Sequence, residues 1–379
     1  MNIRTLRCHV APMAGSWLTD TVIANPMSEY PEYRARRSSW FGQMSAALIE
    51  VELDDGTRGY GFAGGGKGRA VESIVDEQMR ALVEGKPVDS NDLVCEQLYR
   101  ASVFYGRGGL AQCAIAGIDL AMWDARGKIA GRPVHALLGP ARAEMEAYYT
   151  GNDPEALAEF GIRHMKIAIP YGPANGEAGM RANEAAVARA REVLGRDGFL
   201  ALDIYMAWDP GYTVRMMERL EKYDIRWIEE PVFPDDYAGY REIRRRVPCK
   251  VSGGEHEYTL EGFRRLVGEG CVDLAQPDIY RAGGITGLRK IARLAEEAGV
   301  ELICHGVGAP TYHFLATLPE ATTPYCEFLD IFRGGVKEWV LEGEPRVSGG
   351  RLGLGDAPGF GYRFNDRVWR EGLPVATIW

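Results

Sequence analysis

The sequence predicts an α/β fold, a modified TIM barrel of the (β/α)7β type joined to an α+β capping domain. Three observations support this fold class. The first third of the chain reads as strands followed by helices, the region after Met145 alternates short apolar strands with amphipathic helices, and polar residues stand at the end of one strand after another. A barrel suits the third observation better than an open sheet, because barrel strands gather their ends around one mouth.

Residues 1–130 form the expected capping domain. Apolar runs, with Asp55-Gly56 as a hairpin turn, predict three antiparallel strands: Asn2–Val10, Met44–Leu53 and Arg58–Phe62. Apolar residues at helical spacing predict the helices that follow: Arg69–Val83, Asn91–Ser102 and Gly109–Ile129. A polar stretch with two prolines, about residues 15–41, is long for a connection without structure, and such loops usually carry function. We interpret it as a lid over an active site.

Residues 131–335 form the expected barrel domain, in which successive strands are separated by segments long enough for crossover helices. Eight strands are predicted: Met145–Tyr149, His164–Ile169, Phe199–Ile204, Ile225–Glu230, Cys249–Gly254, Val272–Pro277, Glu301–His305 and Tyr325–Leu329. Residues 336–379 combine apolar side chains with Gly and Pro, and we expect this segment to pack back on the capping domain.

Composition limits the class of partner. The 379 residues are 46% hydrophobic and 26% charged, which is typical of a globular protein, and the net charge of −9 argues against nucleic acid or an anionic membrane. Seven scattered cysteines form no C-x-x-C pair, which indicates reduced thiols in the cytoplasm. No apolar run approaches about 18 residues, and the N-terminus lacks a signal-peptide pattern. We expect a cytoplasmic protein that acts on a small molecule.

A glycine-rich segment matches two phosphate-binding patterns. Residues 59–64 fit G-x-G-x-x-G, and residues 61–67 fit most of a P-loop. A P-loop needs Ser or Thr where Gly68 stands, and a dinucleotide site needs a βαβ unit where this chain has an antiparallel hairpin. A glycine-rich turn near the lid is the better interpretation.

Acidic residues and one histidine occupy equivalent strand ends: Asp203, Glu229, Glu255, Asp278 and His305. Each follows the previous one by roughly 25 residues, the length of one βα unit, so they should be neighbours around the barrel mouth. Carboxylates gathered in this way need a partner, because desolvation and mutual repulsion both oppose their charge. A divalent cation is the simplest partner.

Asp203, Glu229 and Glu255 are the predicted metal ligands. Three oxygen ligands leave positions in an octahedral Mg²⁺ shell for water and substrate oxygens. Neither a cysteine nor a second histidine joins the set at these strand ends, which disfavours zinc. Glu230 remains an alternative to Glu229, because the sequence does not separate two adjacent glutamates.

His305 is the predicted general base, with Asp278 as its partner. An aspartate on one strand end can hold the imidazole on the next, which fixes the tautomer and raises the basicity of the ring. The alternative is that Asp278 only caps the following turn. Glu327, at the end of the eighth strand, would complete the ring opposite the metal as a hydrogen-bond donor or acceptor.

The capping domain, the Asp/Glu/Glu set on strands three to five and the His–Asp pair on strands seven and six together resemble the mandelate racemase subgroup of the enolase superfamily. Similar members commonly carry Lys-x-Lys on the second barrel strand, with the second lysine as a base. Here that strand reads His164-Met-Lys166-Ile-Ala168, so the second base is missing. One effective base disfavours two-base racemisation, whereas dehydration can use a single histidine as base and then as acid.

A closer resemblance is to the L-rhamnonate dehydratase group, through ANPMSEYPEY in the lid, Lys166 without a second lysine, and the GEH, QPD, HG and EFL motifs. It implies a Mg²⁺-dependent acid-sugar dehydratase, in which the metal, Lys166 and Glu327 stabilise an ene-diolate and loss of the 3-hydroxyl gives a 2-keto-3-deoxy acid. By the same resemblance Arg37 would meet the substrate and His256 would point a second imidazole into the site. Glu257 departs from a second histidine that members often carry, which leaves the sugar open.

The favoured function is dehydration of an aldonate similar to L-rhamnonate or L-lyxonate by a homo-oligomer. The alternatives are an aldarate dehydratase, or a racemase, epimerase or cycloisomerase of the same superfamily, because the metal site stabilises an ene-diolate whatever follows. A non-catalytic barrel would require the metal ligands to be accidental.

Overall fold

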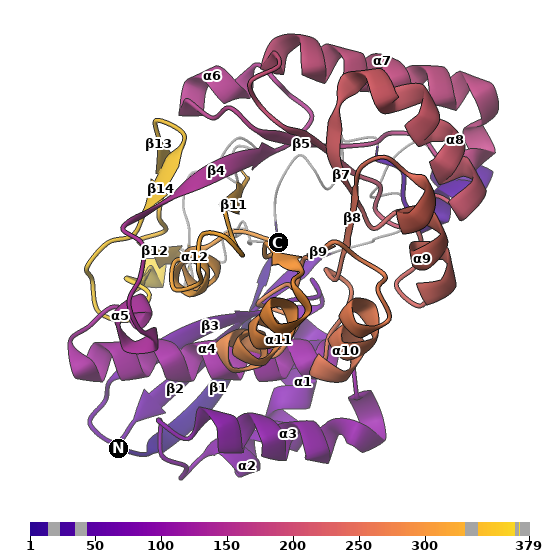
Figure 1. Cartoon of the computed structure of the whole chain (residues 1–379). Coiled ribbons are helices and arrows are strands. Elements are labelled where there is room, and N and C mark those ends of the chain that lie inside the picture. Colours follow the sequence, from indigo (N-terminus) through magenta and orange to yellow (C-terminus); the bar gives the residue numbers. More distant parts are fainter. Residues whose placement is uncertain (14–22, 35–43, 330–339, 368–370, 372–379) are drawn as a thin grey trace.

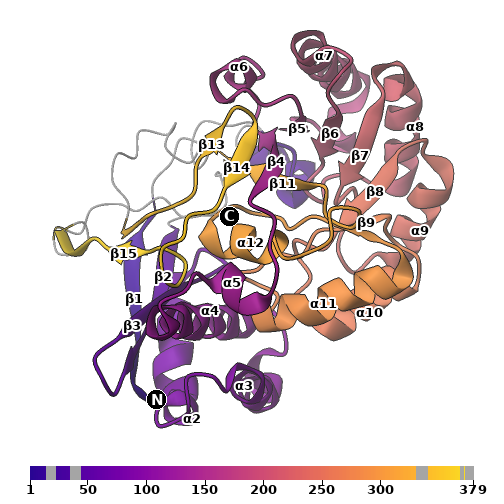
Figure 2. The same ribbon diagram turned by 60° about the vertical axis from the view of Figure 1, so that its left-hand side comes forward.

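A ring of parallel strands wrapped by helices forms the main body of the protein (Figures 1 and 2). A three-stranded sheet with its own helices lies beside that body, and these helices pack on α11 (Gly284–Ala298). The computed structural model describes residues 1–13, 23–34, 44–329, 340–367 and 371. The arrangement confirms the predicted fold class, a modified barrel with an α+β capping domain.

The capping sheet is antiparallel in the order β1-β2-β3, with β1 at Ile3–Pro12, β2 at Ser45–Leu53 and β3 at Arg58–Ala63. Five helices follow it: α1 (Gly68–Ile74), α2 (Arg80–Val83), α3 (Asn91–Gly106), α4 (Leu110–Ala130) and α5 (Val134–Leu138). The first predicted helix is therefore two helices, joined by a π-helical turn at Val75–Met79. The helix α4 packs on β3 and β2, and Asp119 in its middle accepts hydrogen bonds from Thr286 of α11 in the barrel.

The glycine-rich segment serves packing between β3 and α4. A Cβ on Gly59 would lie 2.1 Å from the Ala121 carbonyl oxygen, and one on Gly61 would lie 2.3 Å from that of Gly117. Glycine is therefore required at both positions for the strand to approach the helix this closely. This packing accounts for the glycines without a phosphate site, as the antiparallel setting predicts.

Part of the predicted lid is ordered into short 3-10 turns, at Pro26–Glu29 and Pro31–Tyr33. The Asn25 side chain accepts a hydrogen bond from the Met27 amide at 2.9 Å, and each turn begins at a proline, whose φ suits a first helical position. The stretch therefore differs from the structureless loop that the sequence predicted. The Ala24 amide, just before the first turn, donates to the Ile169 carbonyl of the barrel at 2.8 Å.

The barrel contains all eight predicted strands: β4 (Glu144–Thr150), β5 (Met165–Ala168), β6 (Leu200–Asp203), β7 (Ile225–Glu229), β8 (Lys250–Gly253), β9 (Leu274–Ala275), β10 (Glu301–Leu302) and β11 (Tyr325–Phe328). They run parallel in the order β4 to β10, and β11 pairs with β4. A backbone hydrogen bond from Leu302 to Thr322 at 3.0 Å links β10 to the chain before β11. The crossover helices are α6 (Ala156–Phe160), α7 (Gly176–Leu194), α8 (Pro210–Leu220), α9 (Tyr237–Arg246), α10 (Leu260–Gly268), α11 (Gly284–Ala298) and α12 (Ala309–Leu315).

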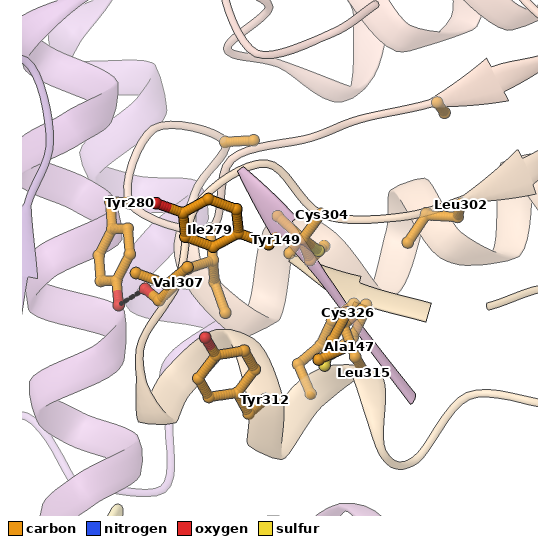
Figure 3. Close-up of a cluster of buried hydrophobic side chains, with 14 of the residues drawn as sticks. Ala147, Tyr149, Ile279, Tyr280, Leu302, Cys304, Val307, Tyr312, Leu315 and Cys326 are labelled. Carbon is orange, nitrogen blue, oxygen red and sulfur yellow. Dashed lines mark hydrogen bonds between the residues drawn. The ribbon is translucent and has the colours of Figure 1, made fainter. Parts of the chain in front are cut away.

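A layer of apolar side chains fills the barrel interior: Tyr148, Ala201, Trp227, Leu274 and Ile303. Alternate residues of a strand point to the same side, so the residue two positions further along each strand also faces inward. That next layer, at the carboxyl ends of the strands, holds the polar residues of the candidate site. A second part of the core surrounds the loops beyond β9 and β10, where the Tyr280 hydroxyl donates to the Val307 carbonyl at 3.0 Å beside Tyr312 (Figure 3).

The described part of the C-terminal segment contacts both the barrel and the capping sheet. Its strands are β12 (Leu341–Glu342), β13 (Val347–Ser348), β14 (Arg351–Gly353) and β15 (Arg363–Phe364), and β14 pairs with β4. The Phe364 ring stacks on Tyr60 of β3 with centroids 5.3 Å apart.

Glu344 anchors the same segment and is partly buried. Its carboxylate accepts hydrogen bonds from the Tyr362 hydroxyl at 2.7 Å and from the Ala309 amide at 2.8 Å. Burial raises the pKa of Glu344 to about 7, although both donors favour the charged form.

None of the helices in the described part of the chain combines the length and the apolarity needed to cross a membrane.

Candidate active site

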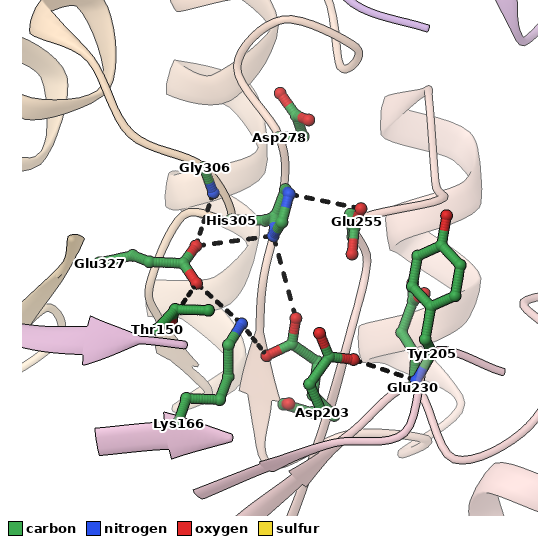
Figure 4. Close-up of polar contacts among 12 residues, drawn as sticks. Thr150, Lys166, Asp203, Tyr205, Glu230, Glu255, Asp278, His305, Gly306 and Glu327 are labelled. Atoms are coloured by element: carbon green, nitrogen blue, oxygen red, sulfur yellow. Dashed lines mark hydrogen bonds and ion pairs between the residues drawn. The ribbon is translucent and has the colours of Figure 1, made fainter. Parts of the chain in front are cut away.

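The predicted functional residues meet at the carboxyl ends of the barrel strands. Lys166 lies on β5, Asp203 and Glu229 end β6 and β7, and Glu327 lies on β11, while the other residues follow the ends of β8, β9 and β10 (Figure 4). Asp203 and Glu229 are register partners across the ladder between β6 and β7. The short parallel strands, each ending at a similar height, therefore create the cluster.

Lys166 is completely buried between two carboxylates. Its Nζ lies 2.7 Å from Glu229 Oε2 and 2.9 Å from Glu327 Oε1. Burial lowers the pKa of the ammonium group, but Glu229 and Glu327 outweigh that effect and hold the pKa well above its ordinary value. Lys166 is thus a fixed positive charge in the floor of the site.

Glu229, Glu255 and His305 form one tight group, whose ligand atoms all lie within 4.8 Å of one another. The Nε2 atom of His305 lies 3.3 Å from Glu255 Oε1, and Nδ1 lies 3.9 Å from Glu229 Oε1 and 3.5 Å from Glu327 Oε2 (Figure 4). Burial, with help from the negative charge of Asp203, raises the pKa of Glu229 to about 8 despite Lys166. Burial acts in the same direction on Glu255, but the neighbouring His305, His256 and Arg281 outweigh it and lower the pKa of Glu255.

Asp203 stands beside this group at a strained turn. Its Oδ1 accepts a hydrogen bond from the Tyr205 amide at 3.0 Å. Tyr205 and Met206 both have positive φ, at 49° and 60°, and so does Glu230, at 41°. Non-glycine residues in this region of backbone space carry strain and tend to cluster at functional sites.

Glu230, the alternative to Glu229, points elsewhere and holds His256. Its carboxylate lies 2.6 Å from His256 Nδ1 and accepts a hydrogen bond from the His256 amide at 3.1 Å. Burial lowers the pKa of His256, but Glu230 and Glu255 outweigh it and raise the pKa. Glu230, Glu255 and His256 also satisfy the geometry of a three-ligand group, so the two adjacent glutamates remain competitors in geometry as they are in sequence.

The backbones of Asp278 and His305 form an isolated parallel β-bridge, in which the His305 amide donates to the Pro277 carbonyl at 3.1 Å. Within residues 44–329, however, no hydrogen bond joins their side chains. Asp278 Oδ1 accepts from the Tyr280 amide at 2.7 Å, the turn-capping contact that the sequence left open, and Oδ2 faces Arg281. The role of Asp278 as partner of the base stays a prediction.

Two residues of the site escaped the sequence reasoning. The Thr150 hydroxyl, at the end of β4, donates to Glu327 Oε1 at 2.6 Å, and the Glu327 Oε2 atom accepts from the Gly306 amide at 2.7 Å. Arg281 contacts both Glu255 and Asp278. Two features of the sequence could have indicated them: Thr150 places a hydroxyl at the end of the first barrel strand, and Arg281 follows Asp278 by three residues. Arg37 lies outside the described residues.

The donor set fits a hard divalent cation. Glu229 Oε1 is buried and has no hydrogen-bond partner in the described structure, and it faces Glu255 and His305. Buried carboxylates without enough cationic partners are costly, and oxygen donors of this kind suit Mg²⁺.

Family models match both parts of the chain. A model of the mandelate racemase / muconate lactonizing enzyme N-terminal domain matches residues 19–139, and an enolase C-terminal domain-like model matches residues 153–368. The chain belongs to the mandelate racemase and muconate lactonizing enzyme family of the enolase superfamily. The resemblance seen in the strand-end motifs is thereby confirmed.

Relatives of this mandelate racemase family member span more than one reaction. A protein named L-rhamnonate dehydratase from Saccharopolyspora erythraea is 40% identical over 361 residues, which are 93% of this chain and 91% of the relative. The crystal structure of rhamnonate dehydratase from Gibberella zeae complexed with Mg has a TM-score of 0.90 and 33% identity, covering 98% of this chain and 96% of that chain. A racemase from Streptomyces coelicolor A3(2) with bound magnesium has a TM-score of 0.82 and 26% identity, covering 97% and 99%. The reaction must therefore be argued from the residues of the site.

Proposed function

We propose that this chain is a Mg²⁺-dependent acid-sugar dehydratase, a hydro-lyase that converts L-rhamnonate, or a similar aldonate such as L-lyxonate, to a 2-keto-3-deoxy acid. The L-rhamnonate dehydratase that is 40% identical over 93% of the chain supports the substrate class. The observation that carries the reaction type is the position of Lys166, which is enclosed by Glu229 and Glu327, with Ala168 where a second lysine would stand. Among the described residues, His305 is then the histidine that lies against both Glu229 and Glu255, whereas His256 lies against Glu255 and Glu230.

Asp203, Glu229 and Glu255 are the proposed ligands of Mg²⁺. When bound, the ion supplies positive charge that polarises the substrate carboxylate and makes its C2 proton more acidic. Lys166 adds a permanent positive charge, and its Nζ holds Glu229 Oε2 at 2.7 Å, which leaves Glu229 Oε1 facing His305 Nδ1 at 3.9 Å. The ligand set is therefore oriented before any ion arrives, which lowers the cost of binding.

His305 removes the C2 proton in this proposal. Lys166 stabilises the negative charge that develops on the substrate carboxylate. Glu327, which Thr150 and the Gly306 amide orient, lies opposite the metal site and forms a hydrogen bond with the substrate. The imidazolium of His305 then protonates the departing 3-hydroxyl, and the resulting enol becomes the 2-keto-3-deoxy acid. Asp278 is proposed to support His305, while His256 and Arg37 are proposed to bind the sugar hydroxyls.

Product analysis by NMR in D₂O tests the proposal. The purified protein with Mg²⁺ is incubated with L-rhamnonate, L-lyxonate and a representative aldarate. We expect a 2-keto-3-deoxy product from an aldonate, and no product after EDTA treatment. Deuterium at C2 without loss of water would indicate a racemase or epimerase. Turnover of the aldarate alone would change the substrate class from aldonate to aldarate. No reaction with any acid sugar would refute the assignment.

We further propose a cytoplasmic homo-oligomer. All seven cysteines lie in the described residues and are free thiols, which suits a reducing compartment. Val103 and Phe104 at the end of α3 are 54% and 97% exposed, an apolar surface that contact with a second copy would cover. Light scattering on a size-exclusion column tests this, because Phe104→Ser should lower the measured mass; a monomeric wild-type protein would contradict it.

A further inference from the structure

Arg281 is a buried arginine at the turn after β9 that the proposed reaction does not use. Its side chain is only 11% exposed, and it lies between two residues of the site. Its Nη1 contacts Glu255 twice, donating to the main-chain carbonyl at 3.0 Å and pairing with Oε1 at 3.1 Å. Its Nε pairs with Asp278 Oδ2 at 3.0 Å.

These contacts place one rigid group across two strand ends. Glu255 follows β8 and Asp278 follows β9, and both carboxylates are almost completely buried, with 5% and 0% of their side chains exposed. The Nη1 hydrogen bond to the Glu255 carbonyl fixes the planar guanidinium, which holds its charge rigidly between the two carboxylates. Its contacts with the carboxylates are ion pairs, since Arg281 Nε and Asp278 Oδ2 make no hydrogen bond in the described structure. A flexible lysine ammonium would not hold its charge in one place. The two oxygens of Glu255 are thereby made unequal, because Oε1 lies between Arg281 and His305 Nε2.

The capping domain holds Arg281 from the other side. The Gly64 amide, just after β3, donates to the Tyr280 carbonyl at 3.0 Å. A Cβ at Gly64 would lie 3.0 Å from Arg281 Cγ and 3.0 Å from the Tyr280 carbonyl oxygen, so the glycine allows close contact between the domains at this point. The position of the Arg281 stem therefore depends on how the capping domain sits on the barrel.

We propose that Arg281 is a positioning residue, which orients the metal ligand Glu255 and the carboxylate of Asp278 together and ties both to the seating of the capping domain through Gly64. This inference rests on the proposed role of Glu255 as a ligand. Groups that orient metal ligands commonly contribute about 10- to 100-fold to metal affinity or activity. The same range is expected here.

Arg281→Lys separates positioning from charge, because lysine keeps the positive charge and loses the fork. Titration of metal-free protein with Mg²⁺ in a calorimeter should give a dissociation constant about 10- to 100-fold above that of the wild type. Arg293→Lys is the matched control, since Arg293 is 80% exposed and pairs only with Glu297 in the contacts described, and its affinity should not change. Unchanged Mg²⁺ affinity in Arg281→Lys, even with a lower melting temperature, would overturn the proposal and leave Arg281 a structural residue.

Gly64→Ala keeps the test decisive if Arg281→Lys does not fold. The added methyl group pushes on Arg281 without removing it, so Mg²⁺ affinity should fall in the same direction but by a smaller factor. Gly268→Ala is its control, because a Cβ there would meet nothing within 4 Å. Equal Mg²⁺ affinity in Gly64→Ala and Gly268→Ala would overturn the link to the capping domain. Product analysis of the wild type is a separate measurement, so a protein that binds Mg²⁺ with the expected sensitivity to Arg281 but forms no product would refute the proposed function alone.

Discussion

Substitution of Glu229 and of Glu230 tests the metal site sharply. The two residues are adjacent in sequence, but Glu229 is a proposed metal ligand and Glu230 binds His256. Glu229 is held by Lys166 through Oε2, and its buried Oε1 has no hydrogen-bond partner in the described structure and lies 3.9 Å from His305 Nδ1. Glu230 is occupied by the amide and ring of His256. Glu229→Gln therefore removes a charged ligand, whereas Glu230→Gln alters a group that orients a neighbour.

The expected magnitudes follow from these contacts. Loss of a partner that only orients a ligand costs about 10- to 100-fold in metal affinity, so loss of a ligand should exceed about 100-fold, or about 2.7 kcal/mol. Glu229→Gln should therefore weaken Mg²⁺ binding by more than about 100-fold and abolish turnover. Glu230→Gln should keep Mg²⁺ affinity within about tenfold of the wild type, because its glutamine can still accept from the His256 amide.

Both variants can be titrated with Mg²⁺ by calorimetry and assayed for 2-keto-3-deoxy product by NMR, with circular dichroism to confirm folding. The two proteins differ by one oxygen-to-nitrogen exchange at neighbouring positions, so each serves as the control for the other. If Glu230→Gln loses Mg²⁺ while Glu229→Gln retains it, the ion sits in the group formed by Glu230, Glu255 and His256, and the ligand assignment is wrong.

Three further outcomes are expected. Asp278→Asn should lower kcat by about 10² to 10⁴ if the carboxylate supports the base, and a rate within a few-fold of the wild type would leave it only the turn-capping role. Arg37→Ala should raise KM by roughly 10- to 100-fold with a smaller effect on kcat, because a charged hydrogen bond to substrate serves ground and transition states alike; a collapse of kcat at constant KM would place Arg37 in the chemistry. The raised pKa of Glu344, about 7, means that the folded state holds this proton more tightly than the unfolded state, so the contribution to stability is complete below pH 4.5 and is lost as pH rises through 7. Urea titrations give the free energy of unfolding at each pH. Between pH 4.5 and pH 8, the free energy of unfolding of Glu344→Gln should rise by roughly 3 kcal/mol relative to that of the wild type. A difference between the two proteins that does not change with pH would contradict this.

Much of the fold could be predicted because parallel barrel strands leave a clear pattern. Each is a short apolar run followed by a helix of amphipathic spacing, and all eight predicted strands are present. The positions of the candidate site residues could be predicted for the same reason, since buried polar residues at the ends of successive barrel strands are uncommon in a purely structural role. The number of residues between successive members of the site equals the length of one βα unit, which indicated that they lie on neighbouring strands.

What escaped prediction depends on backbone geometry beyond the strand ends. Glu229 continues the inward alternation of Trp227, whereas Glu230 has already turned to a positive φ, and sequence does not mark that boundary. Arg281 reaches Glu255 and Asp278 only because the turn after β9 folds back. The turn at Pro26 is capped by the Asn25 side chain, whereas the turn at Pro31 has no side-chain cap and begins at its proline. The polar character of the segment concealed both signals.

The proposed reaction has His305 as its single base, and one variant tests this assignment most directly. His305→Asn is incubated with Mg²⁺ and the acid sugar in D₂O, and proton NMR follows both C2 exchange and product formation. One base for both steps predicts that neither deuterium incorporation nor the 2-keto-3-deoxy acid appears, while Mg²⁺ still binds. Continued exchange at C2 without loss of water would contradict the claim, since another residue would then remove the proton and His305 would serve only as the acid for the departing hydroxyl.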